Sequence, residues 1–288
     1  MIALTALLAA HLGAQSKPAR ARQSSPAPRP QVEIEDPPTA EVLAAITRRG
    51  RVIAEADAAA WLGSGAMTSL ELPHDSIRRL IPRRTSRGWE VACGTLSADE
   101  KAYLMSQLAT PGIYADHWAS SLFEPARPDS GYFARAARAI EASLSMFRRA
   151  APRAYIALAL PADDGPTWFV YVYPAPSQQG VWPRGGDMRF QVSADGRIVT
   201  QSRRLHETIT EYSVRTARSA TTKAADAHPA VSGNAPEDTD VFHVIQRRPA
   251  IPELMTAGRF QYRIDVDGTI RLIGTIPTPP NNAHDRSR

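Results

Sequence analysis

The sequence predicts an α+β protein, in which a helical N-terminal half packs on or beside an antiparallel sheet of hairpins. Two observations favour this class. Apolar residues recur at helical spacing in segments before residue 150, whereas after residue 154 they alternate with polar residues between turn-forming pairs. Helices that precede the strands, and do not alternate with them, argue against a Rossmann or a TIM-barrel arrangement.

The first 14 residues predict export. Met1 to Ala14 is an apolar run that ends in small residues, as signal peptides do, and it is shorter than the roughly 20 residues of a transmembrane helix. We expect cleavage after Ala14, with Ser16 as the alternative. The mature chain would then be a soluble periplasmic or secreted protein without a transmembrane segment. The other interpretation is a disordered apolar start or a misplaced start codon.

Residues 15–38 are expected to form a disordered linker, because a segment dominated by Pro, Ala, Ser and Arg cannot bury a core. The whole chain carries a net charge of +5, and the cations Lys17, Arg20, Arg22 and Arg29 supply most of it. The remainder is therefore close to neutral, which makes nucleic acid an unexpected partner. Residues 277–288 are expected to form a second disordered tail.

Three helices are expected in the first half. Thr39 is a suitable N-cap for a helix that continues, past an interruption at Gly50, to the break at residues 63–65. Ser97-Ala-Asp-Glu100 has the form of a capping box and predicts a helix through Leu108. The clearest helix covers about residues 130–150, where apolar residues recur at steps of three and four.

Three antiparallel hairpins are expected in the second half, because alternating segments flank connections that contain Asp-Gly. They pair residues 154–160 with 167–173, 188–192 with 198 onward, and 260–266 with 270–272, and a further strand is expected over residues 241–245. The predicted organisation is thus a helical region over 39–128 and an α+β domain with an antiparallel sheet over 129–276, as one domain or as two.

Cys93 is the single cysteine, so no intramolecular disulfide can form. Trp89, Val91 and Cys93 alternate with more polar or smaller residues, which places the thiol on the apolar face of a short strand. We expect a core cysteine and not a catalytic thiol, because the neighbouring sequence supplies no base.

Standard catalytic motifs do not occur at the required spacing. His206-Glu207 would need a second histidine at position 210 for a zinc protease, and that residue is Thr210. Gly63-Ser64-Gly65 lacks the nucleophile-elbow pattern, and Asp265 and Asp267 fit a hairpin turn better than a calcium loop. These observations favour a binding protein over an enzyme, and they identify no cofactor.

A polar cluster late in the chain is the candidate for acid–base or metal chemistry. Two imidazoles and a carboxylate, if the fold brought them together, would form a site of ordinary composition. The candidate residues are His206, His243, Glu237, Asp238 and Asp240. The structural alternative is that the carboxylates bond turn amides and the histidines are packed in the core.

Residues 168–173 predict a central strand that is apolar or aromatic on both faces. Helices should cover one face, and loops or a ligand should cover the other, since an aromatic sheet face is suited to apolar ligands. The candidate ligand-binding residues are Phe169, Tyr171, Tyr173, Arg189 and Arg204.

A basic cluster precedes this region. Guanidinium groups favour bidentate contacts with phosphate, so the cluster could meet an anionic surface or a polyanion. Its members are Arg78, Arg79, Arg83, Arg84 and Arg87. The structural alternative is an ordinary solvated face.

The segment from Tyr171 to Ile270 resembles an uncharacterised family of exported proteobacterial proteins. The resemblance is carried by Tyr173-Pro174, Gly185-Gly186-Asp187-Met-Arg189, Val192-Ser-Ala-Asp-Gly196, Arg204-Leu-His206 and Pro236-Glu-Asp-Thr-Asp-Val-Phe242. It implies export and implies no activity.

The sequence as a whole favours an exported soluble module that binds a small molecule or an envelope protein. The alternative is a metal-dependent or acid–base hydrolase that uses His206, His243 and the acidic residues 237–240. A purely structural interaction domain is the third possibility.

Overall fold

The Ala-rich segment after Thr39 forms one long helix. In the computed structural model, which describes residues 36–67, 79–112, 117–163, 165–213 and 233–277, helix α1 covers Ala40–Met67. The helix passes through Gly50 without the expected interruption. A Cβ atom at Gly50 would lie 2.4 Å from Val241 Cβ, so the glycine permits a close approach of another helix and does not break this one.

The region predicted to be helical over residues 39–128 is helical in α1, but a four-stranded antiparallel sheet follows, in the order β1-β2-β3-β4. Its strands are β1 (Arg79–Thr85), β2 (Gly88–Leu96), β3 (Tyr103–Pro111) and β4 (Trp118–Asp129). Cys93 is buried in β2, as predicted.

The helix expected from Ser97 to Leu108 is wrong, because β3 occupies most of it. Tyr103, Met105 and Gln107 are buried and alternate with half-buried neighbours, which is the period of a strand. The residues that look like a capping box form the β2–β3 turn, where Ser97 Oγ donates to Asp99 Oδ1 at 2.7 Å and Glu100 adopts a φ of 57°.

Helix α2 and the second sheet agree with the prediction. Helix α2 covers Tyr132–Met146, and the second four-stranded antiparallel sheet has the order β5-β6-β8-β9. Its strands are β5 (Tyr155–Pro161), β6 (Trp168–Pro174), β8 (Met188–Val192) and β9 (Val199–Arg204). The first two predicted hairpins are therefore confirmed.

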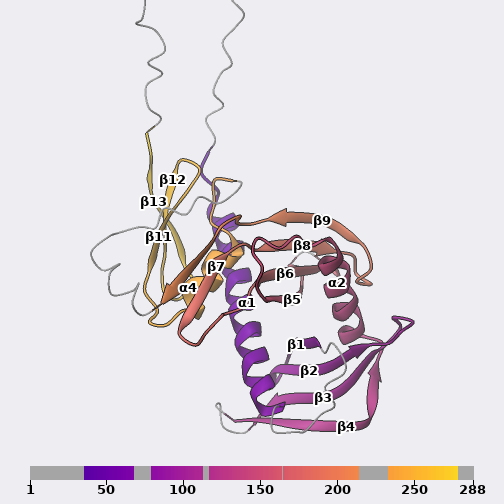
Figure 1. Cartoon of the computed structure of the whole chain (residues 1–288). Coiled ribbons are helices and arrows are strands. Elements are labelled where there is room, and N and C mark those ends of the chain that lie inside the picture. Colours follow the sequence, from indigo (N-terminus) through magenta and orange to yellow (C-terminus); the bar gives the residue numbers. More distant parts are fainter. Residues whose placement is uncertain (1–35, 68–78, 113–116, 164, 214–232, 278–288) are drawn as a thin grey trace, which may run out of the picture. The chain divides into compact units, whose positions relative to one another are not determined.

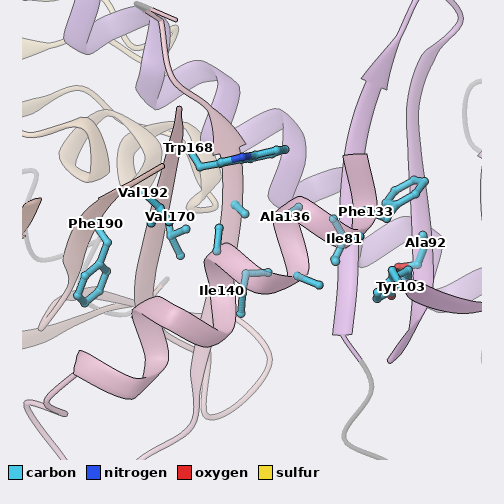
Figure 2. Packing of buried hydrophobic residues seen from close by; sticks show 14 of the residues in the cluster. Ile81, Ala92, Tyr103, Phe133, Ala136, Ile140, Trp168, Val170, Phe190 and Val192 are labelled. Carbon is cyan, nitrogen blue, oxygen red and sulfur yellow. The ribbon is translucent and has the colours of Figure 1, made fainter. Parts of the chain in front are cut away.

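Helix α2 lies between the two sheets, and its small residues allow both to approach it. Figure 2 shows Ala136 and Ile140 of α2 between Val170 and Phe190 of one sheet and Ile81 of the other. Because one cluster of buried side chains contains residues of both sheets, α2 joins them into a common core.

The rest of the described chain forms a two-stranded ladder, a further buried helix and a small sheet. Strand β7 (Val181–Gly185) pairs with β10 (Ile209–Ser213), and helix α4 covers Asp238–Gln246. Strands β11 (Glu253–Ala257), β12 (Phe260–Ile264) and β13 (Ile270–Thr275) form an antiparallel sheet that contains the third predicted hairpin.

The strand expected over residues 241–245 is wrong, because these residues belong to α4. A capping box starts the helix: the Glu237 side chain accepts from the N3 backbone amide, and Asp240 accepts from the Glu237 amide at 2.8 Å. Val241, Phe242 and Val244 are β-branched or aromatic and all three are buried, so this short run has the composition of a buried strand although it is helical.

Helix α1, whose course is seen in Figure 1, contributes buried residues to three further cores. Ile46 packs with α4 and the β11–β13 sheet, Ile53 packs with the face of β5 and β6 that α2 does not cover, and Ala59 packs with β2 and β3. All described residues belong to one compact unit. Within them, none of the helices is both long and apolar enough to cross a membrane.

The predicted signal peptide, most of the predicted linker and the predicted tail from residue 278 lie outside the described residues.

Candidate functional site

A cavity of about 230 Å³ lies where α1, α2 and the two four-stranded sheets meet. Side chains from six elements and one turn line it. They are Arg49 and Val52 of α1, Arg84 of β1, Trp89 of β2, Tyr132 of α2, Leu160 and Pro161 of β5, Asp163 of the following turn, and Phe169 and Tyr171 of β6.

Four aromatic side chains give the cavity an apolar wall. Tyr171 is buried, whereas Trp89, Tyr132 and Phe169 are half-buried. An arginine guanidinium group lies over each of three of these rings. The distances from Cζ to the ring centroid are 5.9 Å for Arg84 over Trp89, 5.6 Å for Arg83 over Tyr132 and 4.9 Å for Arg189 over Phe169.

Arg49 is the charged group that connects the cavity to the protein interior. Its Nε donates to Asp238 Oδ1 at 2.9 Å, and its Nη1 donates to Asp163 Oδ2 at 3.2 Å. Asp238 is buried and also accepts from Arg189 at 2.5 Å and from the Tyr171 hydroxyl at 2.8 Å. Burial lowers the pKa of Arg49, but Asp238 outweighs it and raises that pKa above its usual value.

The polar cluster that the sequence offered as a candidate site lies in a buried network and converges only in part. His206 contacts Asp240, whereas Asp238, Glu237 and His243 face other partners. His206 lies between two carboxylates, with Nδ1 at 2.8 Å from Asp187 Oδ1 and Nε2 at 3.2 Å from Asp240 Oδ1. Burial lowers the pKa of His206, but Asp240 and Asp187 together raise it to about 10. The imidazole is therefore charged at neutral pH, and both of its nitrogens carry protons.

Arginines balance the other carboxylates of the network. Arg184 forms ion pairs with Asp240, at 2.7 Å, and with Glu253, and Arg247 lies 2.5 Å from the second oxygen of Glu253. Burial raises the pKa of Asp240, but the His206 imidazolium and Arg184 outweigh it and hold the pKa well below its usual range.

His243 has the opposite charge state to His206. Its Nδ1 lies 3.8 Å from Glu253 Oε2, which is beyond hydrogen-bond distance. Burial lowers the pKa of His243 well below its usual value, and Arg184 and Arg247 add to this effect. His243 is therefore neutral at pH 7.

Glu237 forms an ion pair with Arg203 at the start of α4. Burial raises the pKa of Glu237 to about 8 against the opposing effect of Arg203, and the neighbouring carboxylates Asp240 and Asp238 contribute to the rise. Glu237 and Asp240 both serve as helix caps, so the acidic run has a structural role at this N-terminus.

The network supplies no arrangement suited to a metal ion. Across the described parts of the chain, no group of three His, Cys, Asp or Glu side chains is placed so that it could hold one. In particular, His206 directs both nitrogens at carboxylates and has no lone pair to offer.

The predicted ligand-binding residues separate into two groups. Phe169 and Tyr171 line the cavity, and Arg189 lies over the Phe169 ring. Tyr173 and Arg204 do not line the cavity. The Tyr173 hydroxyl donates to Asp57 Oδ1 at 2.6 Å, and Arg204 donates to the Arg148 carbonyl at 2.8 Å.

The predicted basic cluster is divided because most of it lies on strand β1, where successive side chains point to opposite faces. Arg79 pairs with Glu141 at 2.8 Å, Arg83 pairs with Glu90, and Arg84 lines the cavity. Arg87 is exposed, and Arg78 lies outside the described residues.

Sequence reasoning missed Arg49, Val52, Tyr132 and Asp163 as parts of a site. They come from three separate segments, and none belongs to a motif. Only the position of Trp89 beside the basic cluster was a local signal.

Comparisons of the chain with protein-family models, with curated proteins and with solved structures gave no significant match.

Proposed function

We propose that this protein is a binding module that holds a small ring-containing molecule in the cavity between α1 and the two sheets. The observation that carries the proposal is the lining of the cavity. It consists of aromatic and aliphatic side chains with a few charged groups among them, which is the usual composition of a small-molecule site.

The size of the cavity limits the ligand. Its volume of about 230 Å³ exceeds the roughly 150 Å³ of an engineered cavity that accepts benzene, and it is below the roughly 300 Å³ at which drug-sized sites begin. A molecule of one or two fused rings fits this range.

Export is part of the proposal and is supported by the apolar run from Met1 to Ala14. A periplasmic or secreted location would expose the cavity to small molecules outside the cytoplasm. Fractionation of the native host, with detection of the chain by antibody, tests this part: recovery in the cytoplasmic fraction would contradict it.

The hydrolase alternative has less support from the geometry. A general base needs a free lone pair at neutral pH and access to a substrate. The protonated His206 lacks the lone pair, and His243 is only 3 % exposed. We therefore place the function at the cavity and not at the buried network.

The test is isothermal titration calorimetry of the full chain with indole-3-carboxylate and with its uncharged isostere indole-3-carboxamide. We expect at least one probe to bind, and we expect Val52→Phe to abolish that binding because the larger side chain fills the cavity. Val42→Phe, at an exposed position of the same helix, is the matched control and should bind as the wild type does. Failure of both probes, or equal binding by Val52→Phe, would overturn the proposal.

A further inference from the structure

The cavity places a fixed cation beside an exposed anion. The Arg49 side chain is 20 % exposed and is held by Asp238, which is 1 % exposed, so its guanidinium is positioned before any ligand arrives. Asp163, the second partner of Arg49, is 44 % exposed and lies in the turn after β5. Asp163 can therefore rotate into solvent at little cost, whereas Asp238 cannot.

A second cation, Arg84, also lines the cavity. Arg84 is 63 % exposed, lies over the Trp89 ring and is 3.6 Å from Glu55 Oε2. A ligand ring in the cavity would thus lie near two guanidinium groups, that of Arg49 on α1 and that of Arg84 on β1.

The aromatic wall itself argues against a cationic ligand. Aromatic cages bind ammonium groups through the negative faces of their rings. Here the rings of Trp89, Tyr132 and Phe169 already interact with arginines of the protein, and a further cation would be repelled by them.

We infer that the ligand is a small aromatic carboxylate whose anionic group displaces Asp163 from Arg49 Nη1. Exchange of one carboxylate for another keeps two carboxylates paired with Arg49, and the ring of the ligand then lies against Trp89 and Phe169. This inference rests on the proposed function and adds the chemical class of the ligand.

The same two probes test the inference, because they share a ring system and differ in charge. We expect indole-3-carboxylate, ionised at pH 7, to bind the wild type about tenfold more tightly than the carboxamide, as one charge-assisted hydrogen bond supplies. Equal or tighter binding of the carboxamide would overturn the inference and leave the proposed function standing, whereas failure of both probes would overturn both.

Asp163→Asn tests the displacement directly. Removal of the competing carboxylate should raise the affinity for indole-3-carboxylate by about threefold, the scale of an exposed ion pair, and should leave the affinity for the carboxamide within about twofold. Asp99→Asn, at an exposed turn that does not line the cavity, is the matched control and should change neither affinity. Unchanged carboxylate affinity in Asp163→Asn would contradict the displacement of Asp163.

Arg49→Gln provides a second, independent comparison. It should abolish the preference for the carboxylate while the carboxamide still binds. The folding of this variant must be checked by circular dichroism, because Arg49 also pairs with the buried Asp238. If the variant does not fold, the Asp163→Asn comparison decides the inference.

Discussion

His206 lies between two carboxylates, so its charge is tied to the folded state. The sequence left open whether His206 and the acidic residues 237–240 converge or are only packed in the core, and the fold brings His206 to Asp240. The sequence did not predict that Arg184, Arg203 and Arg247 would neutralise them, because these arginines come from three separate segments, and ion pairing between distant residues leaves no local pattern.

The two buried histidines should make opposite contributions to the pH dependence of stability. The folded-state pKa of His206 is raised from 6.5 to about 10, so its stabilising effect is complete below pH 6.5 and is lost as the pH rises through 10. The pKa of His243 is lowered, so its cost to the folded state appears as the pH falls below 6.5.

Urea unfolding of His206→Gln and His243→Gln at pH 5, 6, 8 and 10 measures these effects. At pH 6 the loss of one partner of a buried ion pair should reduce the free energy of unfolding of His206→Gln by about 3–5 kcal/mol, and the deficit relative to wild type should shrink toward pH 10. For His243→Gln, the difference in free energy of unfolding from the wild type should instead shrink as the pH falls from 8 to 5, because the wild type alone then bears the cost of its neutral buried histidine. A constant difference between His206→Gln and the wild type would contradict the charged imidazolium.

At the scale of elements, the prediction succeeded where a clear period or a turn pair marks a segment. Helix α2 and the second and third hairpins show periods of three to four or of two, the first hairpin is marked by the turn at Gly165 although β6 is buried on both faces, and the structure confirms all four. The prediction failed at β3 and at α4. The turn before β3 contains the residue types of a capping box, and α4 contains the short apolar run Val241 to Ile245, whose pattern does not distinguish a helix from a buried strand.

The contact between α1 and α4 depends on Gly50. A Cβ atom there would lie 2.4 Å from Val241 Cβ and 2.7 Å from the Asp238 carbonyl oxygen, and the latter is backbone that cannot rotate away. Gly50→Ala should therefore lower the free energy of unfolding by about 1–3 kcal/mol, despite the better helix propensity of alanine.

Gly65→Ala is the matched control on the same helix, because a Cβ atom there would meet no atom within 4 Å. This variant should be as stable as the wild type or more stable by up to about 1 kcal/mol. Chemical denaturation of both variants measures the contrast, and equal stabilities would show that α4 does not approach Gly50 as described.

At the scale of the whole molecule, α1 and α2 make one folding unit of several sheets. Helix α2 is shared by the two four-stranded sheets, and α1 contributes buried residues to three other cores. The sequence predicted neither role, because the number of partners of a helix depends on contacts between residues far apart in the chain.

This arrangement predicts cooperative unfolding. Ile53→Ala removes a buried side chain from the middle of α1 and should cost about 2–5 kcal/mol. Thermal unfolding followed by far-ultraviolet circular dichroism and by tryptophan fluorescence should still give coincident transitions, shifted together to lower temperature. Two separate transitions in the variant would mean that α1 does not couple the sheets.

The central claim is that the cavity is the binding site, and intermolecular nuclear Overhauser effects test it most directly. The measurement uses the full chain, with isotope-labelled Val and Leu methyl groups, and unlabelled indole-3-carboxylate. The proposal predicts contacts from the ring protons of the probe to the methyl groups of Val52 and Leu160, which line the cavity, and none to those of Val42, which is exposed elsewhere on α1. Contacts to Val42 without contacts to Val52, or no contacts at a saturating probe concentration, would contradict it.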